Sequence, residues 1–443
     1  MRLKLLYAFI LLLVQDVYSQ SGFQFEDNKN KVTIPFKFIN NLIIISVEVN
    51  GIPLNFLLDT GVEESILFSL DETDEISFAQ VEKVKIKGFG KKEAFDGYVS
   101  TLNEVKAKSF IDKNHSLYLV LDQDINISSN VGVPVNGIIG YHFFKNNLVK
   151  IDFESQKITI YKNQEKQLKK IAKTFNKVPL ILNNGKPYFT ASLQFDKNNE
   201  DLKAKLLIDT GNSDAVWLFK EKNTQIQVPE INVDDYLGRG FSGDVFGYRG
   251  RIPKFSINEI GFNSPIIAFP NAAETTQIDA IENRLGSVGS EIMKRFTVYF
   301  DYPNSNMYLK KNDFFNDEFN FNMSGIDLQH EGLQWVKETY EDKPTVANNL
   351  LDGNGEKIAS NLKYKFELKP IYIITNIRKN SPADFAGIQK DDIIVKVNNR
   401  NGYNYTLQKL NELLKSGEGK TIELLVDRNG KLLNFKFQLK KVL

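Results

Sequence analysis

Residues 57–61, which read LLDTG, and residues 207–211, which read LIDTG, set the architecture of this chain. In each segment an aspartate, Asp59 or Asp209, follows directly on an apolar run and precedes Thr-Gly. An unpaired carboxylate at the end of a buried run is costly, so each aspartate needs a compensating partner. The 150-residue spacing of the two segments suggests that each is the partner of the other.

A long internal repeat supports this pairing. The segment GIIG at 137–140 returns as GSVG at 286–289, and Asp152 and Asn163 return as Asp301 and Asn312, all with an offset of 149 residues. Several landmarks that keep one offset in one order indicate duplicated structural units. The repeat predicts two related lobes, at 30–163 and 176–312, that face each other across a pseudo-twofold axis.

Each copy has the pattern of a β-rich unit. The apolar segment 42–49 precedes Asn50-Gly51, a hairpin turn signal, and 53–58 returns as a second strand that ends at Asp59. Residues 188–195 and 202–208 repeat this arrangement in the second copy. The sequence therefore predicts a mainly-β fold, in which a charged linker or exposed helix at 164–170 joins the lobes.

The paired aspartates suggest acid–base chemistry. Two carboxylates held close together cannot both ionise easily, so the pair shares one proton, and one group then acts as base while the other acts as acid. The chain has no cysteine and its three histidines are widely spaced, which disfavours a thiol nucleophile or a zinc site. We expect neither a metal nor a cofactor.

These motifs resemble the pepsin and retropepsin superfamily of aspartic proteases. The resemblance covers both lobes and rests on the two Asp-Thr-Gly turns, each followed about 80 residues later by an apolar segment that ends in glycine (Gly140 and Gly289). It implies retropepsin-like β-barrel lobes and a peptide or protein substrate, with a water activated by Asp59 and Asp209. It also implies supporting roles for Thr60, Gly61, Thr210 and Gly211.

A second interpretation stays open, in which the chain keeps this fold but binds peptides without cutting them. Val62-Glu63 and Asn212 follow the two motifs where a small residue is common in the family, and polar Ser287 takes the place of apolar Ile138. Activity of the purified protein would distinguish the enzyme from the binding protein.

Two segments are candidates for flaps that close over the cleft. Gly88-Phe89-Gly90 lies between apparent strands of the first copy, and Gly240-Phe241 lies within GRGFSG at 238–243 in the second. The second segment matches a G-x-G-x-x-G pattern, but no helix is indicated after it, which argues against dinucleotide binding.

The last part of the chain, 323–443, has a different pattern. Ser381-Pro382-Ala383 is a helix start, and the segments SPADFAGI (381–388) and DDIIVKVN (391–398) resemble a PDZ domain. The resemblance implies a small α+β fold that binds peptide C-termini along a strand edge. The candidate carboxylate loop is Ser324, Gly325, Ile326, Asp327 and Leu328, with 368–370 as a rival, and a purely docking or stabilising role remains the alternative.

The N-terminus and the charge bear on location and partners. Basic Arg2 and Lys4 precede an apolar run at 5–14, which predicts a signal peptide over 1–19, cleaved near Ser19. The net charge of +1 favours neither nucleic acid nor an acidic membrane surface. We expect a periplasmic or secreted monomer with no stable membrane span after signal cleavage.

Overall fold

The computed structural model describes residues 22–70, 76–86, 95–120, 127–196, 200–240, 243–272, 283–341 and 362–443. The predicted signal peptide, 1–19, lies outside the described residues. So do the flap candidates Gly88, Phe89, Gly90 and Phe241.

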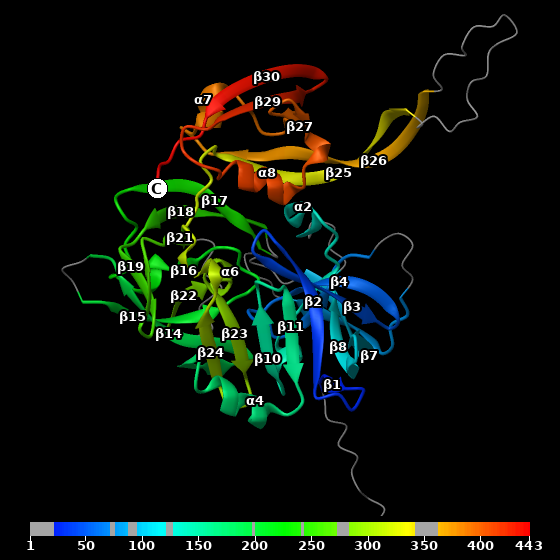
Figure 1. The fold of residues 1–443 in the computed structure, drawn as a ribbon, viewed down its shortest axis with the longest axis vertical. Coiled ribbons are helices and arrows are strands. Elements are labelled where there is room, and N and C mark those ends of the chain that lie inside the picture. The colour runs from blue at the N-terminus through cyan, green and yellow to red at the C-terminus, as the bar shows by residue number, and fades with distance from the viewer. Residues whose placement is uncertain are drawn as a thin grey trace, which may run out of the picture.

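The first lobe, 30–163, is built mainly from antiparallel strands wrapped around an apolar interior, and Figure 1 shows it in blue to cyan. Its elements, together with the flanking β1 and α4, are β1 (Gln24–Phe25), β2 (Lys31–Ile39), β3 (Leu42–Val49), β4 (Ile52–Leu58), β5 (Ser65–Leu67), β6 (Val81–Ile86), β7 (Phe95–Ala107), β8 (Phe110–Leu119), α2 (Ile127–Val131), β9 (Gly137–Ile139), α3 (Tyr141–Phe144), β10 (Leu148–Asp152), β11 (Lys157–Tyr161) and α4 (Gln164–Ile171). The hairpin β3–β4 ends at Asp59, as the sequence predicts.

The second lobe, 176–312, repeats this plan. Its elements are β12 (Asn176–Pro179), β13 (Ile181–Asn183), β14 (Lys186–Gln194), β15 (Leu202–Ile208), β16 (Val216–Leu218), η1 (Lys220–Lys222), β17 (Asn232–Gly240), β18 (Gly243–Arg251), β19 (Lys254–Ile257), β20 (Ile260–Asn263), β21 (Ile266–Pro270), β22 (Arg284–Val288), α6 (Ser290–Met293), β23 (Phe296–Asp301) and β24 (Asn306–Lys311), with η3 (Asp313–Asn316) just beyond. The β14–β15 hairpin occupies the place of β3–β4 and ends at Asp209.

Strands from both lobes also join in one sheet. Strands β12, β24 and β23 of the second lobe continue through β10, β11 and β2 into the sheet of the first lobe. The antiparallel β10–β23 contact pairs Ile151 with Val298, and both side chains are buried. The two lobes thus share a sheet, a connection that the repeat alone does not reveal.

The C-terminal module, 323–443, forms its own sheet around a separate core. Its elements are β25 (Ile326–Glu341), β26 (Leu362–Ile377), α7 (Pro382–Ala386), β27 (Ile393–Val397), β28 (Arg400–Asn401), η4 (Gly402–Asn404), α8 (Leu407–Leu413), β29 (Thr421–Arg428) and β30 (Lys431–Gln438). Ser381 caps α7 through its side chain, and Gly387 ends the helix with a left-handed backbone.

The expected carboxylate loop only partly has the form of a loop. Ser324 and Gly325 form a turn, but Ile326, Asp327 and Leu328 already belong to β25 and pair with β26. The rival segment, 368–370, lies inside β26, where Pro370 pairs with Leu333. A peptide-binding turn is therefore restricted to the residues immediately before Ile326.

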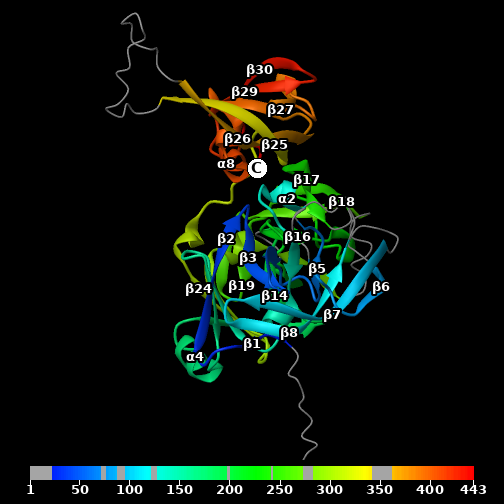
Figure 2. The same ribbon diagram turned by 90° about the vertical axis from the view of Figure 1, so that its right-hand side faces the viewer.

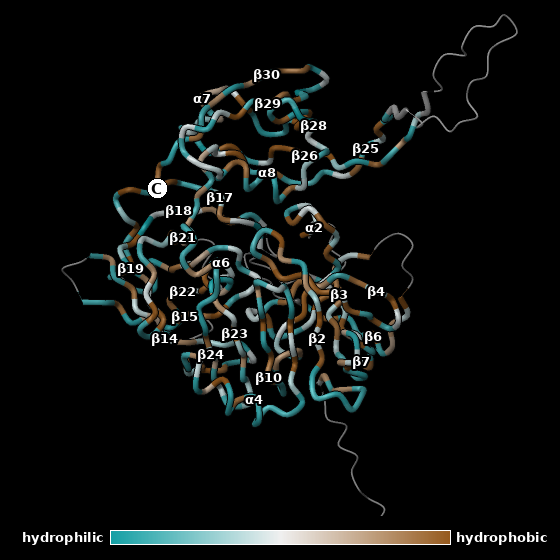
Figure 3. Tube along the Cα trace, viewed as in Figure 1, coloured by the Kyte–Doolittle hydropathy of each residue, from teal (hydrophilic) through white to brown (hydrophobic). Residues whose placement is uncertain are grey.

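The three parts stack closely, and the mainly-β prediction is confirmed. Hydrophobic residues concentrate along the strands inside the lobes (Figure 3). Figures 1 and 2 show the C-terminal module above the two lobes, with α8 and β25 on its lower side near α2 and β17. This position places the module over the turns that carry the two aspartates.

Candidate active site

Asp59 and Asp209 occupy equivalent backbone positions. Asp59 follows β4, which pairs in parallel with β9, and its N–H donates to the carbonyl of Ile139 over 2.9 Å. Asp209 follows β15, which pairs in parallel with β22, and its N–H donates to the carbonyl of Val288 over 2.9 Å. In each lobe the segment from the second half of the repeat, 137–140 or 286–289, therefore supports the turn.

The two threonines lock the turns together through reciprocal hydrogen bonds. The N–H of Thr60 donates to Oγ1 of Thr210 over 3.0 Å, and the N–H of Thr210 donates to Oγ1 of Thr60 over 3.2 Å. Each hydroxyl also donates across the axis, from Thr60 to the carbonyl of Ile208 and from Thr210 to the carbonyl of Leu58, both over 2.8 Å. All of these groups are buried, so the lobes have little freedom to shift at this point.

The two carboxyl groups meet at the centre. The Gly61 position lies within about 3 Å of both of them. Oδ1 of Asp59 accepts from the N–H of Gly61 over 2.7 Å and of Gly211 over 3.2 Å. A methyl group on Gly211 would overlap the Asp59 carboxyl, and one on Gly61 would lie 2.9 Å from Cγ of Asp209. Both glycines are needed because the backbone passes so close to the opposite carboxyl.

The surroundings of the two carboxyls differ in charge. Burial and the neighbouring Asp209 raise the pKa of Asp59 above its usual range. Burial also raises the pKa of Asp209, but the Arg284 guanidinium acts in the opposite direction. Arg284 is 6% exposed, donates from Nε to the carbonyl of Gly286 over 3.1 Å and lies over the Phe219 ring. It is a buried cation beside one half of the pair, and the sequence patterns did not identify it.

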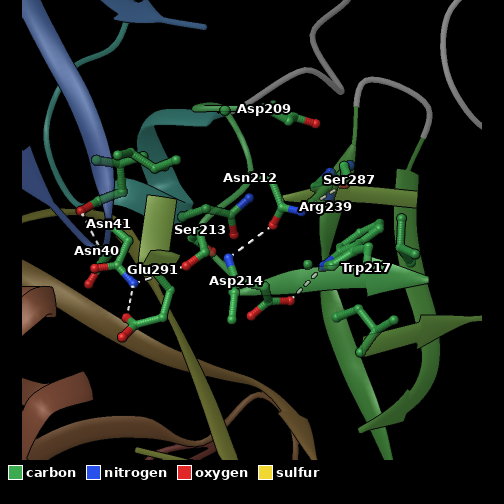
Figure 4. Close-up of a pocket in the computed structure, with 18 of the residues that line it drawn as sticks. Asn40, Asn41, Asp209, Asn212, Ser213, Asp214, Trp217, Arg239, Ser287 and Glu291 are labelled. Atoms are coloured by element: carbon green, nitrogen blue, oxygen red, sulfur yellow. Dashed lines mark hydrogen bonds between the residues drawn. The ribbon is translucent and has the colours of Figure 1, made fainter. Parts of the chain in front are cut away.

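Two departures from the family pattern form a pair. Asn212 donates from Nδ2 to Oγ of Ser287 over 3.3 Å, and its Oδ1 accepts from the N–H of Asp214 over 2.9 Å (Figure 4). The polar residue after the second motif thus has a polar partner behind it. In the first lobe, the corresponding Ile138 belongs to an apolar cluster, and Val62 packs against that cluster.

The acidic residues after the first motif lie apart from the pair's hydrogen bonds. Glu64 forms an ion pair with His142 over 3.4 Å, and the hydrogen bond from His142 lowers its pKa. Next in the chain, Ser65 bonds Nε2 of His115 over 2.8 Å, and Asp112 bonds Nδ1 over 2.9 Å. Ser65, Asp112 and His115 are each at most 4% exposed, so the three residues form a polar cluster in the lobe interior.

The hairpin β17–β18 connects the second turn to the C-terminal module. Arg249 bonds Asp214 over 2.7 Å and Asp235 over 2.9 Å, and Arg378 of the module reaches Asp235 over 3.3 Å. Asp327 of β25 lies in the same cluster. Burial, and to a lesser extent the nearby negative charge of Asp235, raises the pKa of Asp327 to about 7. Gly240 lies at the end of this hairpin, paired with Gly243.

A cavity of about 1740 Å³ contains both aspartates. Its walls come from both lobes, from the β17–β18 hairpin and from β25 and α8 of the C-terminal module. At one side Asn41 of the first lobe bonds the carbonyl of Ser213 and the carboxylate of Glu291 in the second (Figure 4). An extended chain that enters this cavity would therefore contact all three parts of the molecule.

The site is built without clustered metal ligands. Within the part of the chain that the structure describes, no group of three or more His, Asp or Glu side chains is placed to hold a metal ion. No helix among the described residues is long and apolar enough to cross a membrane.

Two family models match parts of this chain. Residues 45–143 match the family model described as aspartyl protease, and residues 373–428 match the model described as PDZ domain. The retrovirus-related Pol polyprotein from transposon 412 of Drosophila melanogaster is 28% identical over 135 residues, which are 30% of this chain and 10% of that protein. The chain thus corresponds to about a tenth of the length of this relative.

Among solved structures, the crystal structure of an aspartic proteinase from Irpex lacteus overlaps 66% of this chain and 100% of its own, with a TM-score of 0.40 and 13% identity. The two family matches fall on the first lobe and on the C-terminal module. The chain is therefore related to aspartic proteases in its first lobe and carries a PDZ domain in its C-terminal part.

Proposed function

We propose that the protein is an aspartic endopeptidase whose catalytic residues are Asp59 and Asp209. The observation that carries this proposal is the pair of adjacent carboxyls in a cavity large enough for a peptide. The interlocked Thr60 and Thr210 support it, because they hold both carboxyls in one geometry without a bound substrate.

The charges around the pair assign a role to each carboxyl. Arg284 stabilises the ionised form of Asp209, so Asp209 is the base that takes a proton from water. Oδ1 of Asp59 already accepts two N–H groups, so its Oδ2 carries the shared proton and donates it to the carbonyl oxygen of the peptide bond.

The reaction then balances without a cofactor. The water oxygen bonds to the carbonyl carbon as Asp209 takes one water proton and Asp59 protonates the carbonyl oxygen. The resulting gem-diol collapses when Asp209 returns its proton to the leaving nitrogen and Asp59 recovers a proton from a diol hydroxyl. The C–N bond breaks, which leaves one new carboxyl and one new amine. These steps follow the general model for aspartic proteases, in which two carboxyls share one proton because both cannot ionise at such short range.

The test compares Asp59→Asn and Asp209→Asn with the parent on a random peptide library, read by mass spectrometry. We expect each change to reduce kcat/KM by a factor of about 10³ or more, because each removes one partner in proton transfer. Asp391→Asn is the matched control, since Asp391 is exposed in the PDZ domain, and it should cut normally. Peptide binding without cleavage by the parent, from acid to neutral pH, would instead support the non-catalytic binding protein.

Location and oligomeric state are part of the same proposal. The basic start and apolar run of residues 2–14 support export, and two half-sites in one chain support action as a monomer. Mass spectrometry of the protein from an exporting host should find a new N-terminus near Gln20, and light scattering should give the mass of one chain. Retention of Met1 in the mature protein would contradict export by signal cleavage.

A further inference from the structure

The groove between β25 and α8 is the part of the PDZ domain where the general mode of peptide binding would apply. β25 is at the end of the strand order of its sheet, so the edge opposite β26 is available to another strand. Leu328 and Gln329 of β25 and Asn411 of α8 line the large cavity. Behind them Ile326, Leu410 and Leu414 lie in the apolar core of the domain. A peptide that adds to such an edge usually places its terminal carboxylate on free N–H groups of the preceding turn.

In this chain, the N–H groups of that turn already have partners. Oδ1 of Asn322 accepts from the N–H of Ser324 over 3.1 Å, from its hydroxyl over 2.7 Å and from the N–H of Gly325 over 3.2 Å. The N–H of Ile326 donates to Oγ of Ser324 over 3.0 Å. The Asn322 carboxamide and the Ser324 hydroxyl therefore occupy the donors that a carboxylate would need.

Asn322 is itself held firmly. Its Nδ2 donates to the carbonyl of Ile326 over 2.8 Å, and its own carbonyl accepts from Nη2 of Arg378 over 2.9 Å. Arg378 also reaches Asp235 of the second lobe. The filled turn is thus part of the contact between the PDZ domain and the second lobe.

The other end of the groove is held by the first lobe. Nε2 of Gln329 on β25 donates to Oδ1 of Asn130 on α2, so the lobe reaches one wall. Gly132, at φ +82°, lies so close to the other wall that an added Cβ would be 2.7 Å from Cβ of Leu407 on α8. Figures 1 and 2 show α2 directly below α8 and β25.

A third contact fixes the same segment. Nδ2 of Asn40 bonds the carbonyl of Val131 over 3.5 Å, and Oδ1 of Asn40 accepts from Asn411 of α8 over 3.4 Å. Val131 is 2% exposed and packs in the apolar cluster with Leu57 and Ile138, which support the Asp59 turn. The segment is therefore joined to the catalytic turn on one side and to the PDZ groove on the other.

We infer that the PDZ groove is an intramolecular docking surface whose occupant is the segment 130–132 of the first lobe, and that an outside peptide terminus binds only by displacing it. A tethered segment acts at an effective concentration in the millimolar range, which weakens apparent binding of a competitor. Binding of such a peptide would also separate the PDZ domain from the two lobes and uncover the cleft.

Disulfide trapping tests the docking, and the chain is suited to it because it contains no cysteine. The pair Asn130→Cys with Gln329→Cys should crosslink rapidly under mild oxidation. The control pair, Asn130→Cys with Leu333→Cys, places the second thiol four residues further along β25, where Leu333 is 56% exposed. It should crosslink at least tenfold more slowly. Equal rates would mean that the PDZ domain moves freely over the lobes and would overturn the inference.

Peptide binding tests the competition. The probe is an array of random decapeptides with free C-terminal carboxylates, applied to chains that carry Asp209→Asn so that no peptide is cut. Gly132→Leu should disrupt docking and raise retention at least tenfold. Gly51→Leu has a similar positive φ but open space around it, and should leave retention unchanged. Asn322→Ala, which frees the turn, should raise retention of free carboxylates over C-terminal amides.

A second variant guards against misfolding of Gly132→Leu. Asn130→Ala combined with Gln329→Ala removes the polar contact without strain and should give an intermediate increase. The double variant Asn130→Cys with Gln329→Cys gives a further check. If its oxidised, crosslinked form retains peptides as well as its reduced form does, the groove is already open and the inference fails. Because these experiments use an inactive dyad, their outcome is independent of whether the parent cuts peptides.

Discussion

The turn that carries Asp59 and the turn that carries Asp209 share one backbone design but have different surroundings. Both follow a strand paired in parallel with a supporting segment. In each turn the threonine N–H donates to the hydroxyl of the threonine in the other turn. Behind Asp59 the support is apolar, through Ile138, whereas behind Asp209 it is polar and includes Ser287 and the cation Arg284. The duplicated backbone brings the carboxyls together, and the unequal surroundings place a cation beside only one of them.

Substitution of the two glycines, Gly61 and Gly211, should give the largest difference in activity between the two turns. A methyl group in Gly211→Ala would collide with the Asp59 carboxyl, and one in Gly61→Ala would meet Asp209 at 2.9 Å. We expect Gly211→Ala to lower kcat/KM by a factor of about 10³ or more, and Gly61→Ala to lower it less, since displacement of a catalytic group by a fraction of an ångström is costly. Steady-state kinetics with thermal melting as a folding check would measure both, and equal losses would contradict the asymmetry.

The threonines should show where the two turns are equivalent. Thr60→Val leaves the N–H of Thr210 without its acceptor and the carbonyl of Ile208 without its donor, and Thr210→Val does the same in reverse. Each change should reduce the free energy of unfolding by about 2–4 kcal/mol, because buried groups lose their partners. Urea unfolding of both variants should give similar losses, and a large difference would show that the lock is one-sided.

Arg284 should distinguish the two carboxyls through the pH profile. The cation lowers the pKa of Asp209, so Arg284→Gln should raise that pKa and move the acid limb of kcat/KM to higher pH. At a pH below the limb, kcat/KM of the variant should fall below that of the parent. Arg284→Lys, which keeps the charge, should restore much of the profile, and an unchanged limb in Arg284→Gln would separate Arg284 from the catalytic pair.

A further buried carboxyl, Asp327, lies at the contact between the PDZ domain and the second lobe. Its neighbours there are Asp235, Arg249, Arg378 and Asn376. Its pKa is raised to about 7, so its contribution to stability is present at acidic pH and is lost as the pH rises through 7. Relative to Asp327→Asn, the parent should lose about 1–2 kcal/mol between pH 5 and pH 8, since the carboxyl retains some solvent contact. Thermal melts across this range would measure the difference, and parallel curves would contradict it.

The smallest expected effect concerns Asn212 and Ser287. A double-mutant cycle with Asn212→Ala and Ser287→Ala should give a coupling energy of about 0.5–1 kcal/mol, as expected for one hydrogen bond between partly buried groups. Zero coupling in urea unfolding would mean that the two departures from the family pattern are independent.

Local sequence patterns were sufficient for the architecture. The two Asp-Thr-Gly turns, the repeat and the strand patterns predicted a mainly-β fold, and Ser381-Pro382 placed the start of α7. Such patterns work because a turn, a cap or a hairpin depends on residues that are close together in the chain.

Contacts between distant residues set the environment of the site. Arg284 lies 75 residues beyond Asp209 in sequence, and Asn322 fills a turn that looked open because its side chain could not be placed from its neighbours. The Arg249–Asp235–Arg378 cluster likewise joins two modules through residues that no shared motif links. The sequence was enough to predict that two aspartates would meet, whereas charge, burial and docking depended on long-range contacts that exist only after folding.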